Sequence, residues 1–131
     1  MRLWHQSLIP HLPSVKDFKG CSNQLGGQHT EIRMILAMIK KRGEVNHSVV
    51  NYVNDHPLSY LRAYGLLVID EMKKRGFNTS EDIEQEYHED VEALRLYRLA
   101  QEGAIIYPEH NNAYLTECLI NLERKGIFLN L

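Results

Sequence analysis

Long stretches of this chain repeat their apolar residues at the spacing of an α-helix, and this periodicity constrains the fold more than any other feature. The first such stretch covers residues 23–41. Ser22 or Asn23 can cap its start, and Gly43 follows its end. Its apolar face has the i, i+3, i+4 pattern of a half-buried helix and consists of Leu25, Ile32, Ile35, Leu36 and Ile39.

A second helix is predicted after the Asp55-His56-Pro57 segment, because proline suits the first turn of a helix. It ends before Gly76, and the cations at positions 73–75 suit the negative end of the helix dipole. A third helix is expected over residues 89–101.

A last helix is expected to begin at Asn111 or Asn112 and to end at Gly126. Residues 43–54 and 104–107 fit short strands or loops equally well. A length of 131 residues suits one domain. The sequence therefore predicts an all-α fold, a compact helical bundle with irregular connections in which residues 1–131 form a single domain.

The cysteine content and the N-terminal residues bear on the compartment. Two cysteines, Cys21 and Cys118, are too few for a disulfide framework and have no zinc-site spacing. The first dozen residues have no long apolar run, so we expect no signal peptide, and no stretch is apolar enough to span a membrane. We expect a cytoplasmic protein that does not enter membranes.

Charge is segregated along the chain, although the net charge is only −2. Basic clusters occur at residues 40–42, 73–75 and 124–125, whereas acidic residues crowd into positions 81–92. A strongly basic overall charge, which is typical of nonspecific DNA binders, is absent. The clusters are consistent with solvated helix ends or with local phosphate-binding sites.

Familiar catalytic motifs are missing from the sequence. It contains no GxGxxG, GxxxxGK[ST], HExxH or GxSxG motif, and none of its seven histidines are paired at i, i+4. We therefore expect neither a metal nor a cofactor.

The N-terminus is a candidate nucleophile. Arg2 is too large for methionine aminopeptidase, so Met1 should be retained. An α-amine ordinarily has a pKa of about 7.7–8.0, against about 10.4 for lysine, so that more of it is free base near neutral pH. Such an amine can form a Schiff base with a sugar carbon.

Glu31 is a candidate partner for this amine. It lies at the edge of the apolar face of the first helix, and Gln28 falls within that face. A buried amide beside a carboxylate suggests a polar opening in the core, where the carboxylate could act as acid or base or stabilise a cationic transition state. A solvated glutamate beside a core helix is the alternative.

Several sequence blocks, in order, resemble the pyrimidine dimer DNA glycosylases of the phage endonuclease V type, and particularly a short bacterial branch that opens with MRLWHQ. The blocks are MRLWHQSLIPHLP, LGGQHTE, NHSVVNYV, DEMKKRGFN and IYPEHNNAYLTECLINLERKGI. The resemblance implies a metal-free helical enzyme that is both a glycosylase and an abasic-site lyase. Its partner would be double-stranded DNA with a damaged or abasic nucleotide, and we expect it to act as a monomer.

Residue roles follow from the same resemblance, position by position. Met1 would provide the attacking amine and Glu31 the catalytic carboxylate. Arg2, His47 and Lys125 would face the DNA.

Some positions depart from the family pattern. Thr30 occupies the place of an arginine, for which Arg33 could substitute as a DNA-binding residue. Residues 14–24 contain an insertion, and the aromatic, basic tail of the phage enzyme has no counterpart. Two alternatives therefore stay open: a non-catalytic DNA- or RNA-binding helical module, and an interaction domain that docks through the acidic residues 81–92.

Overall fold

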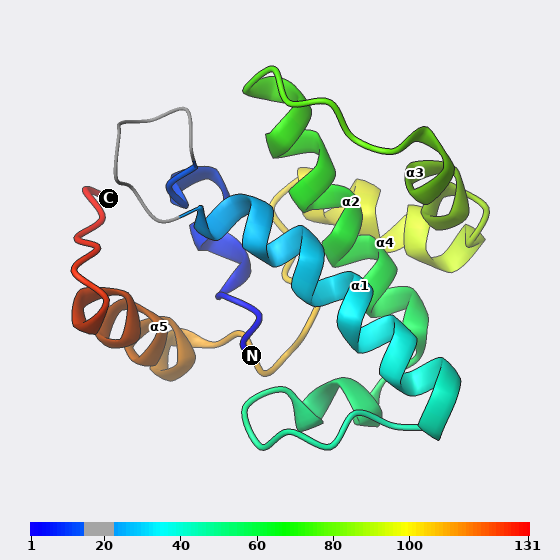
Figure 1. Cartoon of the computed structure of the whole chain (residues 1–131), viewed down its shortest axis with the longest axis horizontal. Coiled ribbons are helices and arrows are strands. Elements are labelled where there is room, and N and C mark those ends of the chain that lie inside the picture. The colour runs from blue at the N-terminus through cyan, green and yellow to red at the C-terminus, as the bar shows by residue number, and fades with distance from the viewer. Residues whose placement is uncertain (15–22) are drawn as a thin grey trace.

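The computed structural model describes residues 1–14 and 23–131 and is all-α, as predicted; no strand occurs in these residues. Most of the expected insertion at 14–24, including Cys21, lies outside the described residues. The helices, in chain order, are η1 (Gln6–His11), α1 (Gln24–Arg42), η2 (Asn51–Asp55), α2 (Leu58–Lys74), α3 (Glu81–His88), α4 (Val91–Gln101) and α5 (Asn112–Arg124), where η denotes a 3-10 helix (Figure 1).

Local capping interactions explain most of the helix ends. Asn23 caps α1, with its side chain accepting a hydrogen bond from the Gly26 N–H, and Gly43 ends the helix in a left-handed conformation (φ 83°). Asn111 caps α5 in the same way as Asn23 caps α1. Pro57 is the residue before α2 and not part of its first turn.

Two parts of the helix prediction were wrong. Residues 81–88 form a helix of their own, α3, which is capped by Ser80. The next helix begins at Val91 and not at residue 89, because Asp90 is its cap. Helix α3 is too short for its apolar spacing to be distinguished within so acidic a segment.

The open choice at residues 43–54 and 104–107 is resolved as well. Turns and the 3-10 helix η2 occupy the first segment, and the second is irregular. The 3-10 helices η1 and η2 were not predicted, since pieces this short produce no recognisable periodicity.

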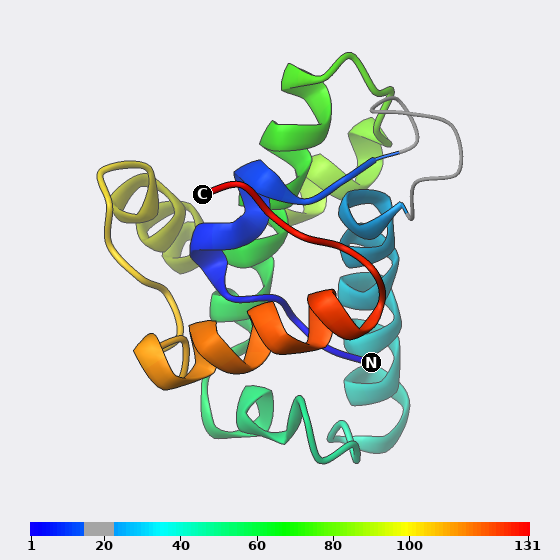
Figure 2. The ribbon, with the colours of Figure 1, turned by 90° about the vertical axis from the view of Figure 1, so that its left-hand side faces the viewer.

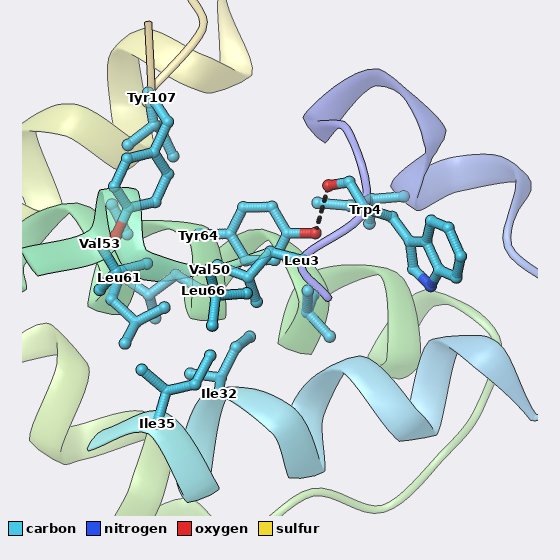
Figure 3. Close-up of a cluster of buried hydrophobic side chains, with 14 of the residues drawn as sticks. Leu3, Trp4, Ile32, Ile35, Val50, Val53, Leu61, Tyr64, Leu66 and Tyr107 are labelled. Carbon is cyan, nitrogen blue, oxygen red and sulfur yellow. Dashed lines mark hydrogen bonds between the residues drawn. The ribbon is translucent and has the colours of Figure 1, made fainter. Parts of the chain in front are cut away.

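Helix α2 is the central element and contacts α1, α3, α4 and both 3-10 helices. It is buried on most of its surface, and the buried apolar side chains of the described residues form one cluster around it (Figure 3). Gly65 allows α3 to approach closely, because a Cβ atom at this position would lie 2.7 Å from the Tyr87 ring. None of the described helices is long and apolar enough to cross a membrane.

The acidic segment pairs extensively with cations of the same chain. Glu84 contacts Lys73 at 3.1 Å, and Arg62 contacts Asp90 at 2.9 Å. Glu86 and Glu92 have arginine partners as well. Three of these pairs link the acidic segment to α1 and α2, and this pairing weakens the hypothesis of an acidic docking face.

The N-terminal residues run through the interior of the fold. Leu3 is fully buried and Trp4 is 3% exposed, so these two apolar residues anchor the chain end. Two views agree that the N-terminus lies between α1 and α5 (Figures 1 and 2). This position brings the chain start next to the helix that contains Glu31.

Candidate active site

The N-terminal segment is held by side chains that bond to its backbone. Gln28, on the buried face of α1, is its main partner. The Gln28 Nε2 group donates to the Arg2 carbonyl at 2.8 Å, and its Oε1 atom accepts from the Trp4 N–H at 3.0 Å. The Tyr64 hydroxyl, from α2, lies 2.7 Å from the Trp4 carbonyl (Figure 3) and 2.7 Å from Gln28 Oε1.

The opposite side of the segment is held from α5 and from the residues before it. The Tyr114 hydroxyl donates to the Leu3 carbonyl at 2.5 Å. His110 Nδ1 accepts from the Gln6 N–H at 3.0 Å, and its Nε2 atom lies 2.8 Å from the Tyr52 hydroxyl.

Burial sets the protonation of these groups. Desolvation, followed by the nearby ring of His5, lowers the pKa of His110 to about 3, so the imidazole is neutral. Because Nδ1 accepts a hydrogen bond, the ring proton resides on Nε2, which donates to Tyr52. Burial also raises the pKa of Tyr114, which therefore keeps the proton that it donates to Leu3.

A pocket of about 320 Å³ opens where the anchored chain end meets α1, α5 and the loop before η2. Five of the six candidate residues from the sequence line it. These are Met1, Arg2, Glu31, His47 and Lys125. The rest of the lining consists of Trp4, Gln24, Gly27, Gln28, Val49 and Asn121.

Glu31 is the acidic residue of this lining. Its Oε2 atom is buried and has no hydrogen-bond partner among the described residues. An unpaired buried carboxylate oxygen is costly, and such atoms in folded proteins call for an explanation such as catalysis or ligand binding. A carboxylate oxygen that lines the same pocket as the α-amine of Met1 can stabilise positive charge or accept a proton.

Arg2 is held in a fixed position at the pocket wall. Its guanidinium lies 5.8 Å from the centre of the Trp4 ring and 5.6 Å from that of Tyr114. It also pairs with Glu117 at 3.4 Å. By contrast, His47 and Lys125 are exposed at the rim, where they are accessible to a large ligand.

Arg33 lies outside the pocket. It pairs with Glu86 at 2.7 Å and lies over the Tyr87 ring, so it faces α3. Thr30 is exposed, and its hydroxyl donates to the Gly26 carbonyl within α1. Arg33 is therefore not part of the pocket that contains the other five candidate residues.

The basic clusters differ in their surroundings. Lys73 pairs with Glu84, and Arg75 binds Glu71 and the carbonyl of Leu12, so these cations serve the fold. Lys125, in the last cluster, reaches the pocket instead.

Sequence reasoning missed several residues of the pocket wall, among them Trp4, Gly27 and Asn121. Asn121 lies on α5 about a turn before Lys125, a spacing that could have indicated it. Gly27 has no periodic signature. No group of three or more His, Cys, Asp or Glu side chains within the described ranges could hold a metal ion.

Comparison with known protein families gave a match that covers most of the chain. A family model described as pyrimidine dimer DNA glycosylase matches residues 1–85, which include Met1, Arg2, Glu31 and His47. No curated protein and no solved structure matches the chain.

Proposed function

Because the chain belongs to the pyrimidine dimer DNA glycosylase family, we propose that it is a DNA glycosylase with abasic-site lyase activity and that the α-amine of Met1 is its nucleophile. The observation that supports this most strongly is that Met1 and Glu31 line the same pocket. Its substrate would be double-stranded DNA containing a damaged or abasic nucleotide, with pyrimidine dimers as one candidate lesion. All the groups invoked come from one chain, so we propose that it acts as a monomer.

In the first step, the lone pair of the neutral amine forms a bond to C1′ of the damaged nucleotide. The bond between C1′ and the base nitrogen breaks, and the base leaves with that electron pair. The bond between C1′ and the ring oxygen O4′ then breaks as the nitrogen passes one of its protons to O4′, which leaves a protonated Schiff base between Met1 and C1′. Glu31 would stabilise the positive charge that develops at C1′.

In the second step, Glu31 would remove a proton from C2′. A double bond forms between C2′ and C3′, and the bond from C3′ to its phosphate oxygen breaks, with the phosphate leaving as an anion. This elimination cuts the strand. Water then hydrolyses the Schiff base and regenerates the amine.

The cationic lining would hold the DNA. Lys125 and His47, at the exposed rim, would contact backbone phosphates, while the fixed Arg2 would face the phosphate nearest the sugar. The reacting sugar must leave the duplex to reach the pocket, as it does in other enzymes that flip nucleotides.

Borohydride trapping on a duplex with one abasic site tests the proposal. We expect a covalent protein–DNA adduct whose attachment maps to Met1 by peptide mass spectrometry, after intact mass has verified that Met1 is the first residue. Chain extension by an N-terminal tag should abolish the adduct. An adduct that forms equally with the tagged chain would refute the assignment of the amine.

Binding without an adduct separates the enzyme from the first alternative. If the duplex binds but no adduct forms, the chain is a non-catalytic nucleic-acid-binding module.

Glu31→Gln should lower the strand-cleavage rate at least about 100-fold, the lower range for general acid–base catalysis. The matched exposed change Glu123→Gln should leave it unaltered.

A further inference from the structure

The amine of Met1 must be held in place to react, and the contacts around it indicate how. We propose that Gln28, on α1, and Tyr114, on α5, are positioning residues for this amine. The hydrogen bonds that these two side chains donate to the N-terminal backbone are called the clamp below. The inference rests on the proposed function. It identifies two residues that act through the N-terminal backbone and not on the DNA itself.

The clamp grips two consecutive carbonyls from opposite sides. Gln28 donates to the Arg2 carbonyl at 2.8 Å from α1, and Tyr114 donates to the Leu3 carbonyl at 2.5 Å from α5. Gln28 also accepts from the Trp4 N–H, so its one amide pairs with both a carbonyl and an N–H group of the N-terminal backbone, which must be paired when they are buried. With Gln28 only 2% exposed, water cannot readily replace these bonds.

Few rotatable bonds separate the clamp from the amine. The peptide bond between Met1 and Arg2 is planar, so only backbone torsions of these two residues can redirect the nitrogen. The Arg2 side chain is itself held between the rings of Trp4 and Tyr114. Rotation of Met1 is the main freedom that remains, and Met1 packs partly buried against the core.

This restriction matters for the chemistry because a nucleophile held at the correct distance and angle reacts far faster than a free one. Met1 has no side-chain base or ring to direct its amine. The backbone must therefore do so, and the clamp on residues 2 and 3 is nearest to it. Tyr114 lies beyond the residues that the family model matches, so α5 contributes to the site in this chain.

The test measures trapping on the abasic duplex at saturating DNA for Gln28→Met and Tyr114→Phe. Gln28→Met preserves the length of the side chain but removes its hydrogen bonds, whereas Tyr64 keeps its bond to the Trp4 carbonyl. Tyr114→Phe removes only the hydroxyl. Ile35→Val, a core truncation away from the pocket, controls for loss of stability.

A second readout distinguishes positioning from a structural role. Reductive labelling of Met1 with a small free aldehyde such as propanal requires a reactive amine, but it does not require the amine to be aligned with a bound sugar. We expect each clamp variant to trap at least tenfold more slowly, with duplex affinity within twofold of the original and propanal labelling no slower. Ile35→Val should change neither rate.

Other outcomes overturn the inference. Unchanged trapping in both variants would show that the clamp does not direct the amine. A parallel fall in trapping and propanal labelling, or an equal fall in Ile35→Val, would assign the effect to folding or to the amine's reactivity. If the original chain itself forms no adduct, the proposed function fails first, and the positioning role fails with it.

Discussion

Gly27 lines the pocket near the start of α1, and the fold does not explain why it is a glycine. The preceding glycine is explained, since a Cβ at Gly26 would lie 2.3 Å from the capping side chain of Asn23. At Gly27, apart from its two chain neighbours and the nearby backbone of α1, no described atom lies within 4 Å of an added Cβ, so the space beside it is open. We therefore predict that Gly27 keeps the pocket accessible to the sugar.

Two substitutions separate stability from access. Gly27→Ala should raise the free energy of unfolding by about 0.5–1 kcal/mol, because glycine is a poor helix former and its φ here is negative. For a chain of 131 residues this corresponds to a rise of about 2–4 °C in the melting temperature. Gly27→Leu should preserve most of this gain, since leucine has a helix propensity close to that of alanine.

Gly27→Ala and Gly27→Leu should differ in activity although their stabilities are similar. An isobutyl group at Gly27 projects into a pocket of about 320 Å³, where it competes with the sugar for space. We expect Gly27→Leu to lower the trapping rate on an abasic duplex at least about tenfold, equivalent to about 1.4 kcal/mol of transition-state stabilisation. Thermal melting and single-turnover trapping, measured on both variants, check this. Full-rate trapping by Gly27→Leu would show that the sugar docks elsewhere.

Three other predictions concern DNA contact, hydrogen bonding and pH. Lys125→Gln should weaken binding to all duplexes and reduce the slope of log K against log salt by about one, whereas Lys73→Gln, which removes an internal ion pair, should leave that slope unchanged in a fluorescence titration. Tyr64→Phe should cost about 1–3 kcal/mol in urea denaturation, because it leaves a buried carbonyl without a donor, whereas Tyr107→Phe should cost nothing, since its buried hydroxyl has no partner among the described residues. Folding lowers the pKa of His110 from an ordinary value of about 6.5 to about 3, so the stability that neutral His110 contributes is complete above pH 6.5. As the pH falls from 6.5 towards 3, this stability is lost at up to about 1.4 kcal/mol per pH unit. A His110→Gln variant should lose stability less steeply over the same range, and equal slopes for the two proteins would contradict this assignment.

The sequence by itself determined the helices whose signals are local. The first helix, with its Asn23 cap and Gly43 terminator, was predicted to within a residue, because apolar periodicity and capping depend only on neighbours along the chain. Retention of Met1 and the choice of Glu31 were likewise proposed from residue types and from the order of the family's sequence blocks. These features identify Met1 and Glu31 as candidate residues for the chemistry.

Only the tertiary structure decided which of these groups meet. It separated Arg33 from the pocket by pairing it with α3, a helix too short and acidic to be recognised in advance. It also revealed the bonds from Gln28 and Tyr114 to the N-terminal backbone. Hydrogen bonds between a side chain and a distant backbone leave no periodic pattern in the sequence, since they arise only when the packed helices bring the chain ends together.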